Sequence, residues 1–494
     1  MKMNSQKRQE LNQLHAFLHQ NAANLPAIDQ AAMLLLQKGF PLEQALKAYQ
    51  NYLERRPTSP NAAYNYAWYL ARDGQFESAI RWYQQALERG IGQPEEVHLN
   101  IGNIYMDHLR DNKKARKEFE AALASNPDYP GAYHNLGNLA EQMGDRDQAT
   151  ACFQKCLELE PGNHTALARL ADAHQFKSTT DPLLARLVEN SASNDPDLHF
   201  ALGSAFNQME DFESAWSHFS RANSLDRVNL PQYSRERTEA VFTRIATESR
   251  HEWLGQFAGT SHEPVFICGM FRTGSTLLEQ VLAAHPAFTA GGESEFFPRL
   301  VQREFLDYPD GLEDITPVET NRWKELHASY AHPFTGGTKR LTDKRPDNFL
   351  YIGLIKAILP SARFIVTKRD WRDVALSIFS TRLGGSQYYS TSLADIRHYI
   401  DQQDILLDHW KTLLGDDLAE VHYENLVQQP REIIGGVLEM LGEEWDERCL
   451  SFDKLANTVK TASVWQIRET FHTRSIGRWK NYQRFFEEIF GSNV

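Results

Sequence analysis

The sequence predicts an α + α/β chain, in which an α-helical solenoid of repeats precedes a three-layer α/β domain with a parallel sheet. The chain has 494 residues, more than a single hydrophobic core usually holds. Its first half repeats itself at a spacing near 35 residues. Its second half contains an apolar, β-branched run followed by a glycine-containing loop and an amphipathic helix. We expect the solenoid over residues 1–230, a helical connector over 231–263 and the α/β domain over 264–494.

The composition is that of a folded protein with an acidic bias. Hydrophobic residues make up 41% of the chain and charged residues 24%, and no stretch approaches the ~20 consecutive apolar residues of a membrane span. The amino-terminal stretch "MKMNSQKRQELNQLHAF" lacks the apolar core of a signal peptide, so we expect a cytoplasmic protein. A formal net charge of −13 argues against nucleic acid as the main partner, although local basic patches can still bind an anion.

The cysteines are too few and too scattered for a disulfide framework, so we expect reduced thiols. They are Cys152, Cys156, Cys268 and Cys449. Cys152 and Cys156 are four apart on an expected helix, where a metal pair is conceivable, but two buried small apolar side chains are the favoured interpretation. His327 and His332 are five apart, which does not place them on one helical face. The sequence therefore predicts no metal site.

The repeats are recognised by small residues at equivalent positions of three segments. "NAAYNYAWYLARDGQFESAIRWYQQALERG" aligns with "EEVHLNIGNIYMDHLRDNKKARKEFEAALASNP" and with "PGAYHNLGNLAEQMGDRDQATACFQKCLELEP". The first small set is Ala67, Gly102 and Gly137, and the second is Ala79, Ala115 and Ala149. Small side chains at such points let paired helices approach closely. The pattern resembles the tetratricopeptide repeat, a helix-turn-helix unit of about 34 residues that stacks into a superhelix.

Two further copies follow the three clear repeats. A weaker one begins at Gly162, and another has Gly203 and Ala215 in the equivalent positions. The resemblance implies a surface that binds a protein or peptide, contacts a neighbouring domain or mediates a homodimer. The repeat alone does not choose among these roles.

The second domain opens with the pattern of a phosphate-binding strand, loop and helix. "PVFICGM" is typical of a buried parallel strand, and "STLLEQVLAAH" carries an apolar helical face. Counting from Gly269 gives G-x-x-x-x-G-S-T, the frame of the P-loop with Ser275 in place of lysine. Main-chain N–H groups, the helix N-terminus and the hydroxyls of Thr273, Ser275 and Thr276 suit phosphate. The positive charge is Arg272, which lies upstream of the usual lysine position.

"GMFRTGSTLLEQVLAAHP" resembles the 5′-phosphosulfate-binding loop of sulfotransferases, particularly bacterial repeat-containing sulfotransferases and tyrosylprotein sulfotransferases. The resemblance implies the donor 3′-phosphoadenosine-5′-phosphosulfate, the product 3′,5′-ADP and no metal. It also implies that the loop binds this cofactor through Arg272, Thr273, Gly274, Ser275, Thr276 and Leu277. Phe271 and Trp371 depart from the family at positions that are commonly proline, and neither change removes a charge or a hydroxyl.

A second half of the nucleotide site is expected after another strand. "SARFIVTKRDWRDVALSIFSTRL" has an apolar run at 364–366 and then a helical pattern. Arg369 and Ser377 are eight apart and match the pair that the family uses for the 3′-phosphate, a planar guanidinium joined by a hydroxyl.

Further cofactor contacts are implied downstream. Tyr423 in "EVHYENLVQQP" matches a family tyrosine near the adenine and the 3′-phosphate. "GRWKNY" is similar to the "GDWKN" element of cytosolic sulfotransferases, and the preceding Arg474 and Ser475 are expected to close over the cofactor, although the full basic-glycine motif is not reproduced. Ser463 in "TASVWQ" is a candidate for a neighbouring hydroxyl donor.

Sulfuryl transfer needs a base for the acceptor proton and a cation for the leaving oxygen. "AGGESEFFPRL" follows the loop helix, where tyrosylprotein sulfotransferases have their catalytic glutamate, and the match falls on Glu293. Glu295 and His285 are rival bases, although His285 is expected to cap its helix. For the cation, the resemblance selects Arg272 and Lys344 of "LTDKRPDNF".

Two other classes of function stay open. An ATP- or GTP-dependent phosphotransferase would share the loop, but the loop lysine is missing and Asp370, beside Arg369, is poorly suited to hold magnesium. A catalytically silent repeat scaffold is disfavoured because the charged candidate residues are all retained. The acceptor is not identified by the sequence: protein tyrosine, polysaccharide and a small phenol or alcohol all remain, as does an amine.

Overall fold

The computed structural model describes residues 5–249, 254, 264–305, 307–336, 338–384, 387–455, 459 and 465–492. The chain divides into two compact units. The first comprises residues 1–141 and 145–166, and the second comprises 142–144 and 167–494. Among the described helices, none combines the length and the apolar character needed to cross a membrane.

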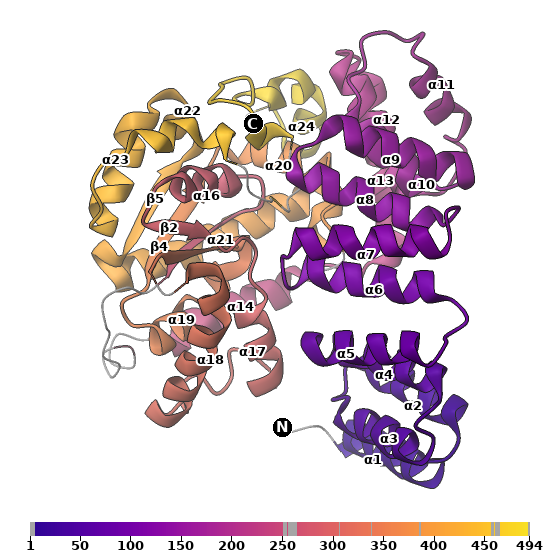
Figure 1. Cartoon of the computed structure of the whole chain (residues 1–494). Helices are drawn as coiled ribbons and strands as arrows, with labels where there is room; N and C mark the ends of the chain where they lie inside the picture. The colour runs from indigo at the N-terminus through magenta and orange to yellow at the C-terminus, as the bar shows by residue number, and fades with distance from the viewer. Residues whose placement is uncertain are drawn as a thin grey trace. The chain divides into compact units, whose positions relative to one another are not determined.

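The first unit is a stack of antiparallel helices (Figure 1). Its helices are α1 (Ser5–Gln20), α2 (Leu25–Gln37), α3 (Glu43–Arg55), α4 (Pro60–Arg72), α5 (Phe76–Glu88), α6 (Pro94–Asp107), α7 (Asn112–Ser125), α8 (Pro130–Met143), α9 (Arg146–Leu159) and the start of α10 (His164–Ala173). A Cβ at Gly102 would lie 2.3 Å from the Phe119 ring, and one at Gly137 would lie 2.5 Å from the Phe153 ring. The recurring glycines therefore let each helix pair close around an aromatic ring, and the predicted repeat solenoid is confirmed.

The second unit contains all the strands that the structure describes, together with the later helices. The helices ahead of the sheet are α11 (Pro182–Glu189), α12 (Pro196–Gln208), α13 (Phe212–Asn229) and α14 (Arg235–Glu248). The strands are β1 (Val265–Gly269), β2 (Phe288–Ala290), β3 (Arg340–Lys344), β4 (Arg363–Lys368) and β5 (Leu418–His422). The remaining α-helices are α16 (Ser275–Ala284), α17 (Phe296–Glu304), α18 (Pro317–Thr335), α19 (Ile352–Ile358), α20 (Trp371–Phe379), α21 (Leu393–Leu414), α22 (Tyr423–Gln428), α23 (Pro430–Leu441) and α24 (Gln483–Phe490).

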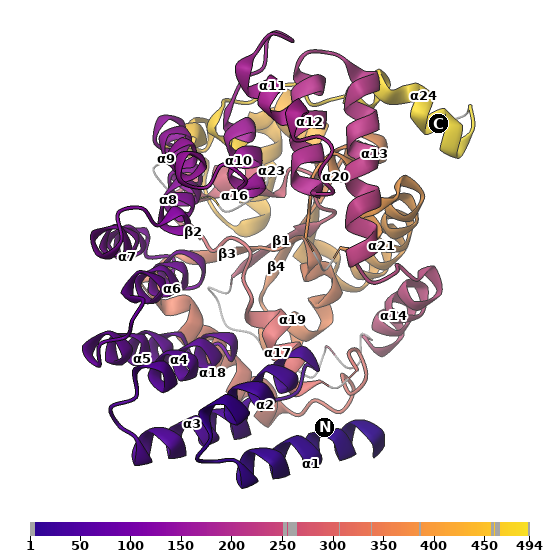
Figure 2. The same ribbon diagram turned by 90° about the vertical axis from the view of Figure 1, so that its right-hand side faces the viewer.

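The five strands form one parallel sheet in the order β2-β3-β1-β4-β5, with β1 central (Figure 2). The register pairs Gly269 with Thr367 and Ile267 with Lys344, so the carboxyl ends of β1, β3 and β4 share one edge. The chain leaves β1 for one side of the sheet and later returns to the other side for β4. Ligands of open α/β sheets bind at the carboxyl edge where the strand order reverses in this way.

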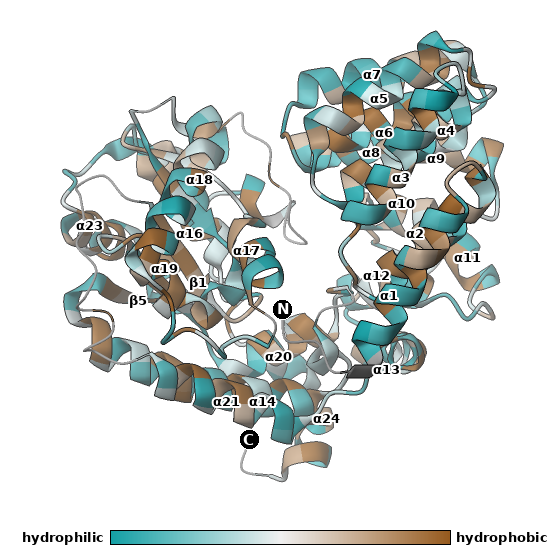
Figure 3. Cartoon of the chain, turned by 90° about the horizontal axis from the view of Figure 1, so that it is seen from below, coloured by the Kyte–Doolittle hydropathy of each residue, from teal (hydrophilic) through white to brown (hydrophobic). Residues whose placement is uncertain are grey.

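Helices cover both faces of this sheet, as a three-layer fold requires. Side chains of β1 alternate between the faces because successive residues of a strand point in opposite directions. Phe266 and Cys268 pack with α14, α17, α19 and α21, whereas Val265 and Ile267 pack with α16 and α23. Figure 3 shows the apolar colouring that gathers around β1 and α19. The predicted α/β domain with a parallel sheet is confirmed.

The last repeat-like hairpin, α12–α13, packs inside the second unit. Its helices close in the repeat manner, since a Cβ at Gly203 would lie 2.5 Å from the Phe219 ring. Its outer face contacts the α/β domain: Trp216 stacks on Phe485 of α24 at 4.5 Å between ring centroids, and Asn223 Nδ2 donates to the Phe379 carbonyl at 2.7 Å. The repeat pattern thus extends to about residue 230, while the compact units divide near residue 166.

Candidate active site

The loop after β1 requires glycine at both of its ends. Gly269 has φ = 137°, and a Cβ there would lie 2.4 Å from the Thr367 carbonyl oxygen of β4. Gly274 has φ = 91°, and a Cβ there would lie 2.7 Å from the ring of Tyr423. Any side chain at either position would displace a neighbouring element. The two glycines therefore let the loop lie directly against β4 and the start of α22.

Between these glycines, the backbone turns through an unusual conformation at Arg272. Arg272 has φ = 70°, a value that costs a non-glycine residue free energy and that often marks a functional site. Thr273 fixes the turn, because its hydroxyl lies 2.6 Å from the Met270 carbonyl oxygen and 2.7 Å from the Thr367 hydroxyl. The Thr273 hydroxyl thus holds the loop, and its backbone N–H remains the group expected to face a phosphate.

The loop leads into the N-terminus of α16. Gly274 is the N-cap, and no side chain caps this helix end. Ser275 and Thr276 occupy the first turn and are buried, and Leu277 follows them. Uncapped N–H groups and the positive end of the helix dipole favour an anion at this end. The predicted loop residues 272–277 therefore lie together around one helix N-terminus.

Four residues from three segments form what we call the anion centre: Arg272, Arg369, Ser377 and Arg478. Arg272 Nε donates to Ser377 Oγ at 2.9 Å, and Arg369 Nη1 donates to the Arg272 carbonyl oxygen at 3.1 Å. The Arg369 guanidinium lies 4.8 Å from the centroid of the Tyr423 ring. The structure therefore brings together the predicted phosphosulfate loop and the predicted pair for the 3′-phosphate.

The anion centre carries excess positive charge. Burial, together with the neighbouring Arg369 and Arg478 guanidinium groups, lowers the pKa of Arg272 to about 10. Burial also lowers the pKa of Arg369, which is partly opposed by Asp373. The Nε atom of Arg369 is buried and has no hydrogen-bond partner. A buried donor without a partner is costly, and a bound anion would satisfy it.

The C-terminal segment is fastened to the anion centre through Asp373. Its carboxylate accepts the N–H of Gly477 at 2.6 Å and the N–H of Trp479 at 3.0 Å, and it lies 3.9 Å from the Arg369 guanidinium. Arg369 also donates to the Ser475 carbonyl oxygen, so Ser475 reaches the centre through its backbone.

One predicted cofactor residue has another partner in the structure: the Arg474 side chain is 61% exposed and forms an ion pair with Glu469. Ser463 lies outside the described residues. The roles of both residues stay predictions.

The second charged cluster pairs Glu293 with Lys344. Lys344 Nζ lies 2.6 Å from Glu293 Oε1; the lysine side chain is 2% exposed and the glutamate 38%. Lys344 is the last residue of β3. Glu279 of α16 positions the glutamate loop, because its buried carboxylate accepts the Gly292 N–H at 2.7 Å. The pair combines a base that solvent can reach with a buried cation.

The rival bases have other partners. Glu295 forms an ion pair with Arg345 at 2.7 Å. His285 is the C-cap residue of α16; its Nδ1 accepts the Ala287 N–H at 3.2 Å, and its Nε2 lies 3.0 Å from the Glu444 carbonyl oxygen. Both ring nitrogens of His285 thus contact backbone groups, as expected for a capping residue.

Two carboxyl groups near the Glu293–Lys344 pair have raised pKa values: Asp343, which is buried, and Asp347, whose side chain is 20% exposed. Burial raises the pKa of Asp343 to about 7 and that of Asp347 to about 6, where Arg345 opposes the rise while Glu293 and Glu295 add to it. Asn348 Nδ2 donates to Asp343 Oδ1 at 2.9 Å. This side of the site is therefore acidic, in contrast to the anion centre.

The described residues offer few side chains for binding a metal ion or for thiol chemistry. Among the described residues, no group of three or more His, Cys, Asp or Glu side chains is arranged to hold a metal ion. Asp370 caps α20 and binds Arg372 with both carboxylate oxygens, at 2.9 and 2.6 Å, so it is already engaged. All four cysteines are free thiols, and burial raises the pKa of Cys156 to about 11.

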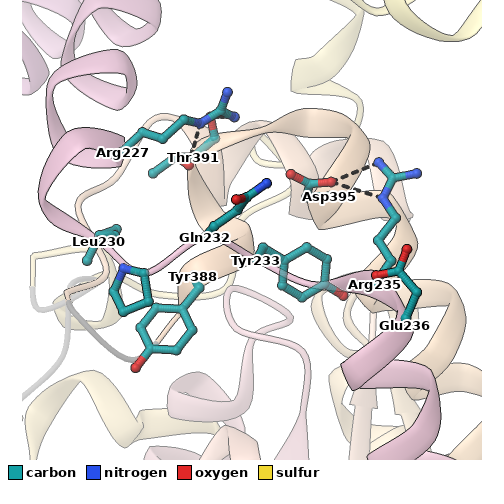
Figure 4. Close-up of a pocket in the computed structure, with 10 residues that line it drawn as sticks. Arg227, Leu230, Gln232, Tyr233, Arg235, Glu236, Tyr388, Thr391 and Asp395 are labelled. Carbon is teal, nitrogen blue, oxygen red and sulfur yellow. Dashed lines mark hydrogen bonds and ion pairs between the residues drawn. The ribbon is translucent and has the colours of Figure 1, made fainter.

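A cavity of ≈ 580 Å³ lies elsewhere in the second unit, between the α13–α14 connection and the start of α21. Figure 4 shows Arg227 bonded to Thr391 and Arg235 paired with Asp395 on its walls. None of the predicted site residues lines it. It therefore adds nothing to the candidate active site.

The sequence interpretation did not identify three residues of the site: Glu279, Asp373 and Arg478. Glu279 and Asp373 carry carboxylates on buried faces of helices, and such a position is a usable signal, because a buried carboxylate needs a partner. Arg478 stands where the "GDWKN" element has its aspartate, and this difference from the element is a second usable signal.

Comparisons with known proteins agree with this architecture. Residues 264–447 match the model of the sulfotransferase family, and residues 30–94, 95–129 and 130–163 match tetratricopeptide-repeat models. A sulfotransferase domain from the olefin synthase of Synechococcus PCC 7002 is 22% identical with a TM-score of 0.36, covering 45% of this chain and 89% of that one.

Curated relatives include an uncharacterized protein of Aquifex aeolicus, 25% identical over 79% of this chain and 52% of the relative. A protein-tyrosine sulfotransferase of Drosophila melanogaster is 25% identical over 39% of this chain and 40% of that protein. This chain thus spans about half the length of the Aquifex aeolicus protein and a smaller share of the Drosophila melanogaster protein. The chain joins tetratricopeptide repeats to a domain of the sulfotransferase family.

Proposed function

We propose that the chain is a sulfotransferase that uses 3′-phosphoadenosine-5′-phosphosulfate as donor and an acceptor hydroxyl or amine. The observation that carries the proposal is the anion centre, where Arg272, Arg369 and Ser377 meet beside an uncapped helix N-terminus. A nucleotide with separate 3′- and 5′-phosphates suits two adjacent cationic positions. The buried, unpaired Nε of Arg369 fits such an anion as well.

Each part of the site has one task in this proposal. Arg369 and Ser377 bind the 3′-phosphate, and residues 272–277 bind the 5′-phosphosulfate through backbone N–H groups and hydroxyls. Tyr423 lies against Gly274 and under Arg369, where it can contact the nucleoside. When bound, the donor supplies an electrophilic sulfuryl group and a phosphate leaving group.

Glu293 and Lys344 act on the acceptor and on the leaving oxygen. Glu293 takes the proton of the acceptor hydroxyl or amine, since its carboxylate is partly exposed and is held in place by Lys344 at 2.6 Å. Lys344, together with Arg272, offsets the negative charge that develops on the bridging oxygen. The acceptor gains SO₃, the acceptor proton leaves through Glu293, and 3′,5′-ADP is released.

For the repeats, we propose a role in choosing the acceptor, a protein or peptide in the first instance, with a homodimer as the alternative. The two curated relatives above do not decide between these roles, since only part of each is matched. A transfer assay with radiolabelled donor and fractionated lysate, scored for label in protein, glycan and small molecules, would identify the acceptor class.

Calorimetry tests the donor site directly. We expect 3′,5′-ADP to bind without magnesium and more tightly than 5′-AMP or ATP, because only 3′,5′-ADP carries the 3′-phosphate. Equal affinity for ATP would favour the phosphotransferase instead, and no binding of any nucleotide would favour the silent scaffold.

A further inference from the structure

The loop that carries Glu293 runs beside β3 and pairs with it just before the glutamate. The Gly291 N–H donates to the Thr342 carbonyl oxygen at 2.7 Å, and the Lys344 N–H donates to the Gly292 carbonyl oxygen at 2.9 Å. These hydrogen bonds continue the parallel pairing of β2 with β3. They hold the backbone on the amino-terminal side of Glu293.

Ser294 is the inward-facing residue between two outward-facing glutamates. It is buried, whereas the side chains of Glu293 and Glu295 reach solvent. The Ser294 hydroxyl oxygen accepts the Phe296 N–H at 3.2 Å, and the hydroxyl donates to the carboxylate of Asp343 on β3. On the carboxyl-terminal side of Glu293, a side chain therefore continues the contact with β3 that the backbone makes before it.

Asp343 accepts two donors in a buried position near the end of β3. Asn348 Nδ2 donates to its Oδ1 at 2.9 Å, and the Ser294 hydroxyl is the second donor. Burial raises the pKa of Asp343 to about 7; these two hydrogen bonds and the charge of Arg345 oppose the rise, and the Glu279 carboxylate adds to it. A carboxyl group with a raised pKa takes stability from the fold as the pH rises toward that value. Stabilising the fold therefore does not explain an ionised Asp343.

We propose that Asp343 is a positioning residue for the base and that, through the Ser294 hydroxyl, it holds the Glu293 carboxylate in place to take the acceptor proton. The proposal rests on the proposed function, in which Glu293 is the base. A general base must lie within hydrogen-bond reach of the proton that it removes, and a displacement on the order of 1 Å can lower a rate about a hundredfold.

Both residues that flank Glu293 are held by buried carboxylates. Glu279 accepts the Gly292 N–H at 2.7 Å, and Asp343 accepts the Ser294 hydroxyl. The two carboxylates come from different elements, α16 and β3. The loop therefore has little freedom to turn Glu293 away from Lys344, and no proton needs to pass through Ser294.

Ser294→Ala tests the proposal, because it removes the hydroxyl and leaves every charged group in place. The assay measures label transferred from radiolabelled 3′-phosphoadenosine-5′-phosphosulfate to a cell lysate at saturating donor, and calorimetry measures 3′,5′-ADP binding by the same full chains. We expect a rate lower by about tenfold or more and an affinity within about twofold. Ser294→Thr keeps a hydroxyl and should restore most of the rate. The control is Thr320→Ala, which removes a buried hydroxyl that donates to the Pro317 carbonyl in α18; it should transfer label like wild type.

Two further variants ask whether the effect passes through Glu293. Asp343→Asn leaves one acceptor oxygen for two donors, so it should lower the rate by a similar factor. Its unfolding temperature at pH 8 should not fall, because the substitution also removes a buried charge. In a Glu293→Gln background, Ser294→Ala should cause no further loss of rate, because the base that it positions is already absent.

The outcomes separate this proposal from the proposed function. If Ser294→Ala transfers label like wild type, or lowers the rate equally in the Glu293→Gln background, the positioning role is wrong and the proposed function stands. If Asp343→Asn lowers the unfolding temperature at pH 8, or Thr320→Ala loses as much rate as Ser294→Ala, the contacts serve the fold and the positioning role is again wrong. If the wild type transfers no label and does not prefer 3′,5′-ADP to 5′-AMP, the proposed function fails and the positioning role fails with it.

Discussion

The anion centre and the Glu293–Lys344 pair differ in charge and in construction. The anion centre gathers arginines from the β1 loop, the end of β4 and the C-terminal segment, with excess positive charge. The Glu293–Lys344 pair is balanced and is built from β3 and one loop next to it. The first is suited to holding an anion and the second to moving a proton, so changes in the two should affect different steps.

The C-terminal segment of the anion centre packs against the last repeat hairpin. The C-terminal segment that carries Arg478 packs through Tyr482, Phe485 and Phe486 in the same core as Phe200 and Phe219 of α12–α13. Tyr482 Oη donates to Asn207 Oδ1 at 2.8 Å. Lys344 of the Glu293–Lys344 pair instead ends a strand of the central sheet.

The largest effect is expected from truncation. A chain that begins at Ser261 lacks α12–α13 and exposes the apolar faces of α20 and α24, so we expect it to lose cooperative folding and 3′,5′-ADP binding. A chain that begins at Pro161, ahead of α10, keeps both. Thermal unfolding and calorimetry on the two chains measure this. Equal binding by both would show that the hairpin is dispensable for the anion centre.

Glu293→Gln is expected to have the next largest effect. The substitution keeps the shape of the side chain and removes its basicity, so turnover should fall by ~10²–10⁴. Affinity for 3′,5′-ADP should stay within a few fold, because Glu293 is outside the anion centre. Steady-state transfer with saturating donor, together with calorimetry, separates the two quantities.

Glu295→Gln is the matched control, since Glu295 pairs with Arg345 rather than Lys344. We expect this variant to turn over nearly as fast as wild type. An inactive Glu295 variant beside an active Glu293 variant would reverse the assignment of the base.

Arg369→Ala should lower the affinity for 3′,5′-ADP. Loss of a charge-assisted contact costs ~1.5–3 kcal/mol, which corresponds to roughly ten- to a hundredfold weaker 3′,5′-ADP binding. Affinity for 5′-AMP should change much less, since it lacks the 3′-phosphate. A variant that loses turnover at saturating donor and keeps its affinity would place Arg369 with the proton-transfer residues instead.

Short sequence patterns predicted the fold and most of the residues proposed for the site. The strand at 265–269, the glycine loop and the pair Arg369 and Ser377 are each recognisable within about ten residues of sequence. The contacts of Asp373 were not predictable, because its partners Gly477 and Trp479 are about a hundred residues away. The same holds for the side chain of Arg272, whose bond to Ser377 depends on a backbone conformation that the sequence does not specify.

The repeat pattern shows the same limit. It predicted that small residues such as Gly102 and Gly203 let paired helices approach closely, and in the structure each of these glycines lies against an aromatic ring. It did not predict what the outer face of each hairpin contacts, because that face is set by side chains such as Trp216 and by residues far along the chain.

The smallest functional effect is expected from a matched pair of cavity variants, Phe219→Ala and Phe119→Ala. Each ring is buried and fills the space beside a repeat glycine, so each truncation should cost about 3–5 kcal/mol of unfolding free energy in its own unit. Only Phe219 shares a core with the C-terminal segment. We therefore expect Phe219→Ala to weaken 3′,5′-ADP binding by a few fold and Phe119→Ala to leave it unchanged, measured by calorimetry below the unfolding transition. Equal effects of the two variants on affinity would mean that the anion centre does not depend on the last hairpin more than on the earlier repeats.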